Sequence, residues 1–189
     1  GWLSCLIRAA TIYPLGVFDP GEVLRRIEED KITVMPGAPT IFQTMMDHPD
    51  FEKRDVSSLR LATTGATVIP VDLIRKMHEV IGIDHVYSAY GLTETCGVVS
   101  LCQKGDDFET IATTVGRPLP ETEVILVDED GNQVITGEEG EIWVRGFNAR
   151  QGYLDATEDT ARTITSDGWL KTGDVGTMDE KGYLRINDR

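Results

Sequence analysis

The spacing of apolar residues constrains the fold most, and it changes between the two halves of the chain. In residues 1 to about 100, short apolar runs such as 32–35 alternate with stretches whose apolar residues recur every three or four positions, such as 70–81. Strand and helix repeated in this way are typical of an open sheet with mostly parallel strands, because a helical crossover must separate parallel strands. We therefore predict an α/β subdomain over residues 1–108.

The helix after Asp19 has the clearest start signal. Pro20 is suited to the first helical position, and Glu22 completes a capping box with Asp19. A helix-like apolar stretch also opens the chain, at residues 2–7. Further strands are predicted at residues 11–13, 32–35, 59–63 and 86–89, and further helices from about residue 40 and from Pro70.

The second half has short apolar runs separated by tight-turn signals. Residues 128–132 read Asp-Glu-Asp-Gly-Asn, which is a hairpin signal. Strands are predicted at 124–127, 141–145, 169–171 and 183–186, with one short helix at 156–162. We therefore predict a small, β-rich, barrel-like subdomain over residues 109–189.

The charge balance and the cysteines narrow the class of protein. Acidic residues outnumber basic ones by 32 to 18, and the net charge of −14 argues against nucleic acid or an anionic membrane as a partner. The three cysteines are an odd number without metal-ligand spacing, so reduced thiols in a cytoplasmic protein are expected. No apolar run approaches the roughly 20 residues of a membrane span. Because both ends interrupt a structural pattern, we expect an internal fragment of a longer protein.

The most informative motif is Tyr-Gly-Leu-Thr-Glu-Thr at residues 90–95, directly after a predicted strand. Ligands of open α/β sheets bind beyond the carboxyl ends of the strands. Tyr90 offers a ring that can stack on a base, Thr93 a hydroxyl for a phosphate, and Glu94 a carboxylate for Mg²⁺. The same residues could instead form an ordinary strand-to-loop turn.

Two weaker motifs also follow predicted strands. Residues 63–67 form a turn of small residues that would let the backbone approach a flat ligand. Asp174 ends the stretch 169–174, where a carboxylate could bind ribose hydroxyls. Plain turn chemistry is the better explanation of either motif when it is taken alone.

In this order and spacing, the motifs resemble the adenylate-forming superfamily, which includes acyl-CoA synthetases, aryl-CoA ligases, luciferases and peptide-synthetase adenylation domains. The resemblance covers the whole chain, and its other marks are Gly116-Arg117-Pro118, residues 140–146, Gly152-Tyr153 and Thr172-Gly173-Asp174. It implies that the adenine lies along Gly65, Ala66 and Thr67, stacks on Tyr90 and lies near Ile186. It implies that Asp174 and Arg189 contact the ribose and that Thr93 contacts the α-phosphate. Gly91 is also expected among the nucleotide-binding residues. Thr93 and Glu94 are the expected catalytic residues, with Glu94 the Mg²⁺ ligand. Val68 departs from the proline that many members carry.

The resemblance also implies where an acyl group would lie. Ser88, Ala89, Gly91 and Gly97 fall where relatives line the acyl pocket, and acetate-using relatives carry tryptophan at the position of Gly91. Because all four residues are small here, an open pocket for a fatty or bulky acid is expected. The alternative is that these residues are small only for backbone packing.

The implied activity is ATP-dependent synthesis of an acyl-CoA from a carboxylic acid, with ATP, Mg²⁺ and CoA. Trp-Leu-Lys before Thr-Gly-Asp, at residues 169–174, favours an acyl-CoA synthetase over an adenylation domain that loads a carrier protein. The superfamily's phosphate loop and its lid with the catalytic lysine match no segment here and are expected in the remainder of the parent chain. By itself, the chain is therefore expected to be a non-catalytic nucleotide-binding or structural piece.

Overall fold

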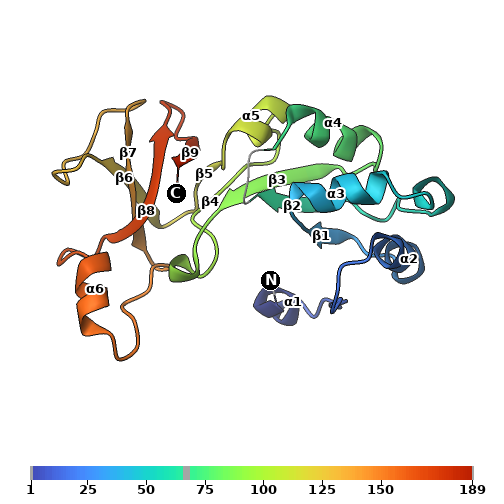
Figure 1. The fold of residues 1–189 in the computed structure, drawn as a ribbon, viewed down its shortest axis with the longest axis horizontal. Coiled ribbons are helices and arrows are strands. Elements are labelled where there is room, and N and C mark those ends of the chain that lie inside the picture. The colour runs from blue at the N-terminus through green and yellow to red at the C-terminus, as the bar shows by residue number, and fades with distance from the viewer. Residues whose placement is uncertain (1, 66–68, 189) are drawn as a thin grey trace.

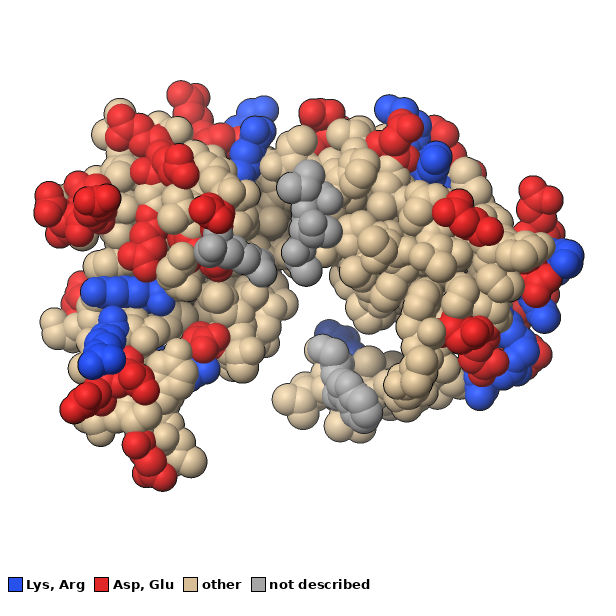
Figure 2. Space-filling view, viewed as in Figure 1, with Lys and Arg blue, Asp and Glu red and all other residues tan. Residues whose placement is uncertain are grey.

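The computed structural model describes residues 2–65 and 69–188, and within these it forms two separate sheets (Figure 1). The first sheet has five strands in the order β1-β2-β3-β4-β5, and the second has four in the order β6-β7-β8-β9. Acidic side chains are spread over both halves of the surface, and a notch separates the halves on the face that Figure 2 shows.

The first sheet is mostly parallel, as the alternation of strand and helix predicts. Its parallel strands are β1 (Val34–Pro36), β2 (Leu61–Gly65) and β3 (His85–Tyr90), and the antiparallel pair β4 (Ser100–Leu101) and β5 (Arg117–Pro118) follows β3. The helical segments of this half are α1 (Trp2–Ile7), α2 (Pro20–Asp30), α3 (Pro39–Met46), η1 (Phe51–Lys53), α4 (Val71–Glu79), η2 (Thr93–Thr95) and α5 (Phe108–Thr113).

The start of α2 follows the local chemistry of its sequence. The side chain of Asp19 accepts a hydrogen bond of 2.7 Å from the backbone N–H of Glu22, which satisfies one of the donors that a helix start leaves without a partner. Val23, Leu24 and Ile27 are the buried residues of the helix. They belong to a core that also includes residues of α3, α4, α5 and the first sheet.

The second half is an open antiparallel sheet. Its elements are β6 (Thr122–Val127), β7 (Glu139–Gly146), α6 (Thr157–Thr163), β8 (Leu170–Met178) and β9 (Leu184–Asp188). Each strand pairs with its neighbour in sequence, from β6 to β9, so the sheet is not a closed barrel. The β-rich character that we expected is therefore confirmed, and among the described residues the subdomain is an open sheet rather than a closed barrel.

A second core joins the two halves. Leu126, Ile142, Val144 and Leu184 from the second sheet are buried together with Tyr90, at the end of β3, and with Val99. This cluster holds the end of a parallel strand against the antiparallel sheet. The C-terminal edge of the first sheet and one face of the second are thereby brought together.

Some local predictions differ from the structure. Residues 11–13 form no strand, and β4, β5 and α5 were not predicted. With two residues each, β4 and β5 are too short to show an alternating pattern. The subdomain boundary between residues 108 and 109 stays a prediction, while the change from one sheet to the other lies between Pro118 and Thr122, because α5 and β5 pack with the first half.

Candidate functional site

The C-terminal ends of the parallel strands bring two predicted motifs side by side. Gly65, the last residue of β2, pairs in register with Ala89, the penultimate residue of β3. A Cβ atom on Gly65 would lie 2.9 Å from the carbonyl oxygen of Ala89, so this close approach requires glycine. Beside it, Thr64 is buried, and its Oγ1 has no hydrogen-bond partner among the described residues.

Tyr90 and Asp174 meet, although they are 84 positions apart in the sequence. The Tyr90 hydroxyl donates a hydrogen bond of 2.5 Å to Oδ2 of Asp174, in β8. Tyr90 is 2% exposed and Asp174 6%, so the contact is sealed from solvent. Ile186, in β9, packs against the same cluster as the Tyr90 ring. The structure thus brings together three of the predicted nucleotide-binding residues.

The burial of Tyr90 bears on its predicted role. A ring that stacks on a purine must offer one face to the ligand, whereas this ring packs among Val99, Leu126, Ile142, Val144 and Leu184. Stacking of Tyr90 on adenine remains a prediction. It requires one face of the Tyr90 ring to be uncovered. What the structure adds is an anchoring role, because the hydroxyl holds the Asp174 carboxylate.

Glu94 lies in η2 and is held by the loop that follows β7. A guanidinium nitrogen of Arg150 lies 3.0 Å from Oε1 of Glu94, and the Tyr153 hydroxyl donates to the same oxygen over 3.1 Å. Thr93, one residue earlier, is exposed. Tyr153 lies in the Gly152-Tyr153 mark of the resemblance, whereas no sequence signal pointed to Arg150.

The four residues predicted to line an acyl pocket do not share one environment. Side chains alternate along a strand, so Ser88 and Ala89 point to opposite faces of the sheet, and Ser88 is 2% exposed. A Cβ on Gly91 would lie 2.3 Å from the carbonyl oxygen of Gly97, which leaves no room for a side chain. Gly97 itself is exposed with φ +95°. Gly91 is thus small for backbone packing in this structure, the alternative noted above.

Three predicted site residues, Ala66, Thr67 and Arg189, lie outside the described residues, as does Val68.

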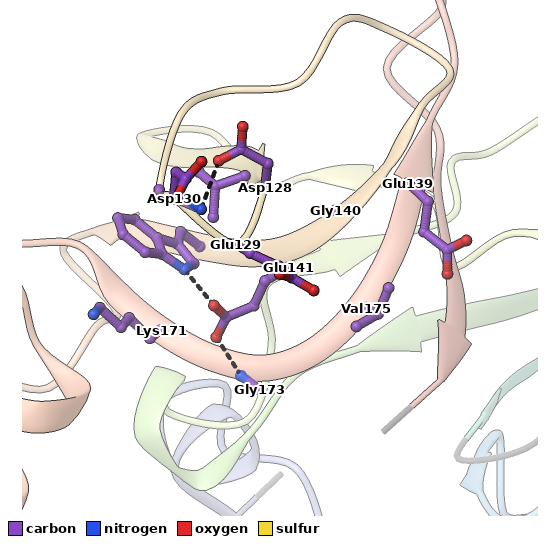
Figure 3. A pocket seen from close by; sticks show the side chains of 12 residues that line it. Asp128, Glu129, Asp130, Glu139, Gly140, Glu141, Lys171, Gly173 and Val175 are labelled. Carbon is purple, nitrogen blue, oxygen red and sulfur yellow. Dashed lines mark hydrogen bonds between the residues drawn. The ribbon is translucent and has the colours of Figure 1, made fainter.

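A hollow lies on the face of the second sheet that points away from Tyr90 (Figure 3). It measures about 670 Å³, and Lys171, Gly173 and Val175 of β8 face it, so the alternation of the strand points Asp174 away from it. Glu141 bridges the hollow's wall, accepting hydrogen bonds from the Trp143 indole and from the backbone N–H of Gly173. A smaller hollow of about 330 Å³ lies beside Tyr87 and Arg117. Neither includes a predicted nucleotide-binding residue.

Over residues 2–65 and 69–188, no three His, Cys, Asp or Glu side chains gather to hold a metal ion. A single carboxylate such as Glu94 still fits Mg²⁺, which binds proteins through one or two carboxylates and takes phosphate oxygens and water as its other ligands. Within the same residues, no helix is both long and apolar enough to cross a membrane.

Comparison with known proteins places the chain in a family. The family model described as AMP-binding enzyme matches residues 1–154. The 3-[(3aS,4S,7aS)-7a-methyl-1,5-dioxo-octahydro-1H-inden-4-yl]propanoyl:CoA ligase of Rhodococcus jostii (strain RHA1) is 49% identical over 189 residues, which are 100% of this chain and 35% of the relative. The chain therefore spans about a third of the length of this relative.

Solved structures agree on the fold. The O-succinylbenzoate coenzyme A synthetase of Bacillus subtilis, in complex with AMP, matches 99% of this chain and 37% of its own chain, at a TM-score of 0.85 and 27% identity. The anthranilate CoA ligase AuaEII, in complex with anthranoyl-AMP, matches 95% of this chain and 34% of its own, at a TM-score of 0.83 and 29% identity. The family model, which covers more than half of the chain, decides the assignment. The chain belongs to the family of AMP-binding enzymes.

Proposed function

We propose that the chain is part of an ATP-dependent acyl-CoA ligase, in which it contributes one side of the nucleotide site. The observation that carries the proposal is the buried hydrogen bond between Tyr90 and Asp174. It fixes a carboxylate beside the C-terminal edge of a mostly parallel sheet, where nucleotides bind in folds of this kind. The nearby buried hydroxyl of Thr64, without a partner among the described residues, is a further polar group for a ligand at this edge.

The proposed reaction has two steps. A substrate carboxylate attacks the α-phosphorus of ATP, and pyrophosphate leaves. The thiol of CoA then attacks the acyl carbonyl, the proton of the thiol is lost, and AMP leaves. Proteins that catalyse phosphoryl transfer contribute mainly positioning and charge neutralisation.

Each residue has a defined task in this proposal. Asp174 would accept hydrogen bonds from the ribose hydroxyls while Tyr90 holds it in place. The exposed hydroxyl of Thr93 would donate to the α-phosphate, and Glu94 would hold Mg²⁺, which neutralises phosphate charge. The phosphate loop and the lid lysine would come from the rest of the parent protein.

The substrate class is proposed from a relative. The Rhodococcus jostii relative is named for a ring-bearing propanoyl group. We extend this to the parent of the present chain as a preference for fatty or bulky ring-bearing acids. A cytoplasmic location is part of the proposal, supported by the free thiols of Cys5, Cys96 and Cys102.

The decisive experiment separates the two half-reactions in the parent protein. Glu94→Gln should slow ATP–pyrophosphate exchange by at least about tenfold, yet leave thioester formation from a supplied acyl adenylate much less affected, because Mg²⁺ neutralises charge chiefly in the first step. Glu123→Gln is the matched control, since Glu123 also pairs with an arginine but lies away from the site. Equal losses in both half-reactions would show that Glu94 has a structural role.

Two further measurements test the proposal. The 189-residue chain alone should show no exchange above a blank without protein. Offered CoA and a phosphopantetheinylated carrier protein, the parent should acylate CoA. Acylation of the carrier alone would favour the adenylation-domain alternative.

A further inference from the structure

The carboxylate of Glu94 has a cationic partner within the chain. Arg150 and the Tyr153 hydroxyl both contact its Oε1 atom, at 3.0 and 3.1 Å. The Arg150 side chain is 22% exposed and that of Glu94 26%, so water screens the pair only partly. The predicted metal ligand is therefore neutralised from the other half of the molecule.

Backbone contacts fasten the segment that carries Arg150. The backbone N–H of Arg150 donates to the carbonyl of Glu94 over 2.8 Å. The side-chain amide of Asn148 donates to the carbonyl of Val98, also over 2.8 Å. These bonds hold the main chain of residues 148–150 against the loop after β3. An exchange of the cation bound to Glu94 therefore requires only the Arg150 side chain to move.

The guanidinium of Arg150 also stacks on the Tyr153 ring while it contacts Glu94. The central carbon of that group lies 3.8 Å from the centre of the ring, within the range of a cation–π interaction. Arg150 can therefore leave the carboxylate and still keep a favourable contact. Tyr153 can keep donating to Oε1 while the arginine moves.

Charge decides which cation Glu94 holds. A divalent ion carries twice the charge of a guanidinium and attracts a carboxylate more strongly at the same distance, and two cations on one carboxylate repel each other. We propose that Arg150 is the counterion of Glu94 in the nucleotide-free protein and that Mg²⁺ displaces it when the nucleotide binds. This inference rests on the proposed function, which assigns Mg²⁺ to Glu94.

The competing interpretation is a purely structural clamp. A clamp predicts that loss of Arg150 lowers stability and leaves divalent-cation binding unchanged or weaker. A displaceable counterion predicts the opposite sign for binding, since the metal no longer competes with a guanidinium. The sign of the change in metal affinity therefore separates the two interpretations.

The test measures Mn²⁺ binding, as a stand-in for Mg²⁺, by electron paramagnetic resonance of the parent protein saturated with AMP. Arg150→Met should bind Mn²⁺ about fivefold more tightly, the factor that corresponds to a partly exposed ion pair at the upper end of its usual strength. Arg150→Gln, which keeps a hydrogen-bond donor without the charge, should behave like Arg150→Met. Arg150→Lys should stay close to the wild type, because it restores the charge.

Arg145→Met is the matched control. Arg145 also pairs with a glutamate, Glu123, and also stacks on an aromatic ring, that of Trp169, but it lies outside the proposed site. Its loss should leave Mn²⁺ affinity unchanged. Unchanged or weaker Mn²⁺ binding in both Arg150→Met and Arg150→Gln would overturn the counterion proposal. Wild-type Mn²⁺ affinity in Glu94→Gln would instead overturn the metal assignment in the proposed function.

Discussion

The hydroxyl of Tyr90 lies 2.5 Å from Oδ2 of Asp174, and this buried hydrogen bond links the last residue of β3 to the middle of β8. The contact joins the two sheets at the place where a nucleotide site is proposed. Asp174 therefore has two tasks, since the carboxylate proposed to bind ribose also satisfies a buried hydroxyl. Variants at this position must be chosen so that the two tasks are separated.

Substitution of Asp174 in the parent protein should affect both ATP use and stability. Asp174→Ala removes the acceptor of the Tyr90 hydroxyl, which should lower the free energy of unfolding by about 1–3 kcal/mol. It also removes the charge-assisted bonds to ribose, so the KM for ATP should rise at least about tenfold. Asp174→Asn keeps an acceptor and should recover most of the stability but not the KM. Urea unfolding and steady-state kinetics test this, and a wild-type KM in both variants would contradict it.

Substitution of Gly91 should impair folding before it can alter substrate choice. A Cβ there would lie 2.3 Å from the Gly97 carbonyl oxygen and 2.6 Å from Cα of Val98, both in the backbone. Gly91→Ala should therefore cost about 1–3 kcal/mol or more in the free energy of unfolding, as overpacking does. Gly16→Ala is the control, because nothing lies within 4 Å of its missing Cβ.

This result changes what we expect of Gly91→Trp. The resemblance suggested that tryptophan here would close an acyl pocket and favour acetate. The structure shows backbone where the side chain would begin, so we expect misfolded protein instead. A folded Gly91→Trp variant that prefers acetate would restore the earlier interpretation.

Alkaline pH should weaken the contact between Tyr183 and Asp106. Hydrogen bonding to the Asp106 carboxylate, together with burial, raises the pKa of Tyr183 above its usual value. A raised folded-state pKa contributes stability that is present below the unfolded pKa, near 10, and is lost as pH rises through the folded pKa. Urea unfolding from pH 8 to 11 should show a steeper loss of stability for the wild type than for Tyr183→Phe. Parallel curves would refute the prediction.

Alkylation should distinguish the cysteines by exposure. Cys102 is 1% exposed, and burial raises the pKa of its thiol, so little reactive thiolate forms. Cys96 is exposed. Brief iodoacetamide treatment of the native protein, read by peptide mass spectrometry, should label Cys96 at least about tenfold faster than Cys102. Denaturant should remove the difference, and equal native rates would contradict the described burial.

Predictions from sequence succeeded where the signal is local. The Asp19 cap depends on atoms within three residues, and the structure shows the hydrogen bond to Glu22. The main strands and helices lie within a few residues of the predicted positions, because hydrophobic spacing reports which face of each element is buried. The strand predicted at 11–13 failed because a strand exists only where a partner pairs with it, and that partner cannot be read locally.

The sequence by itself thus determined the α/β character, the order of the elements and the motifs of an AMP-binding enzyme. Tertiary structure alone decided which distant side chains meet. The bond from Tyr90 to Asp174 spans 84 residues, and the ion pair from Arg150 to Glu94 joins two different halves. The packing of the second sheet against the end of β3 brings these groups together. Local preferences act over a few residues, whereas such contacts depend on how whole elements pack, so they became visible only in the folded chain.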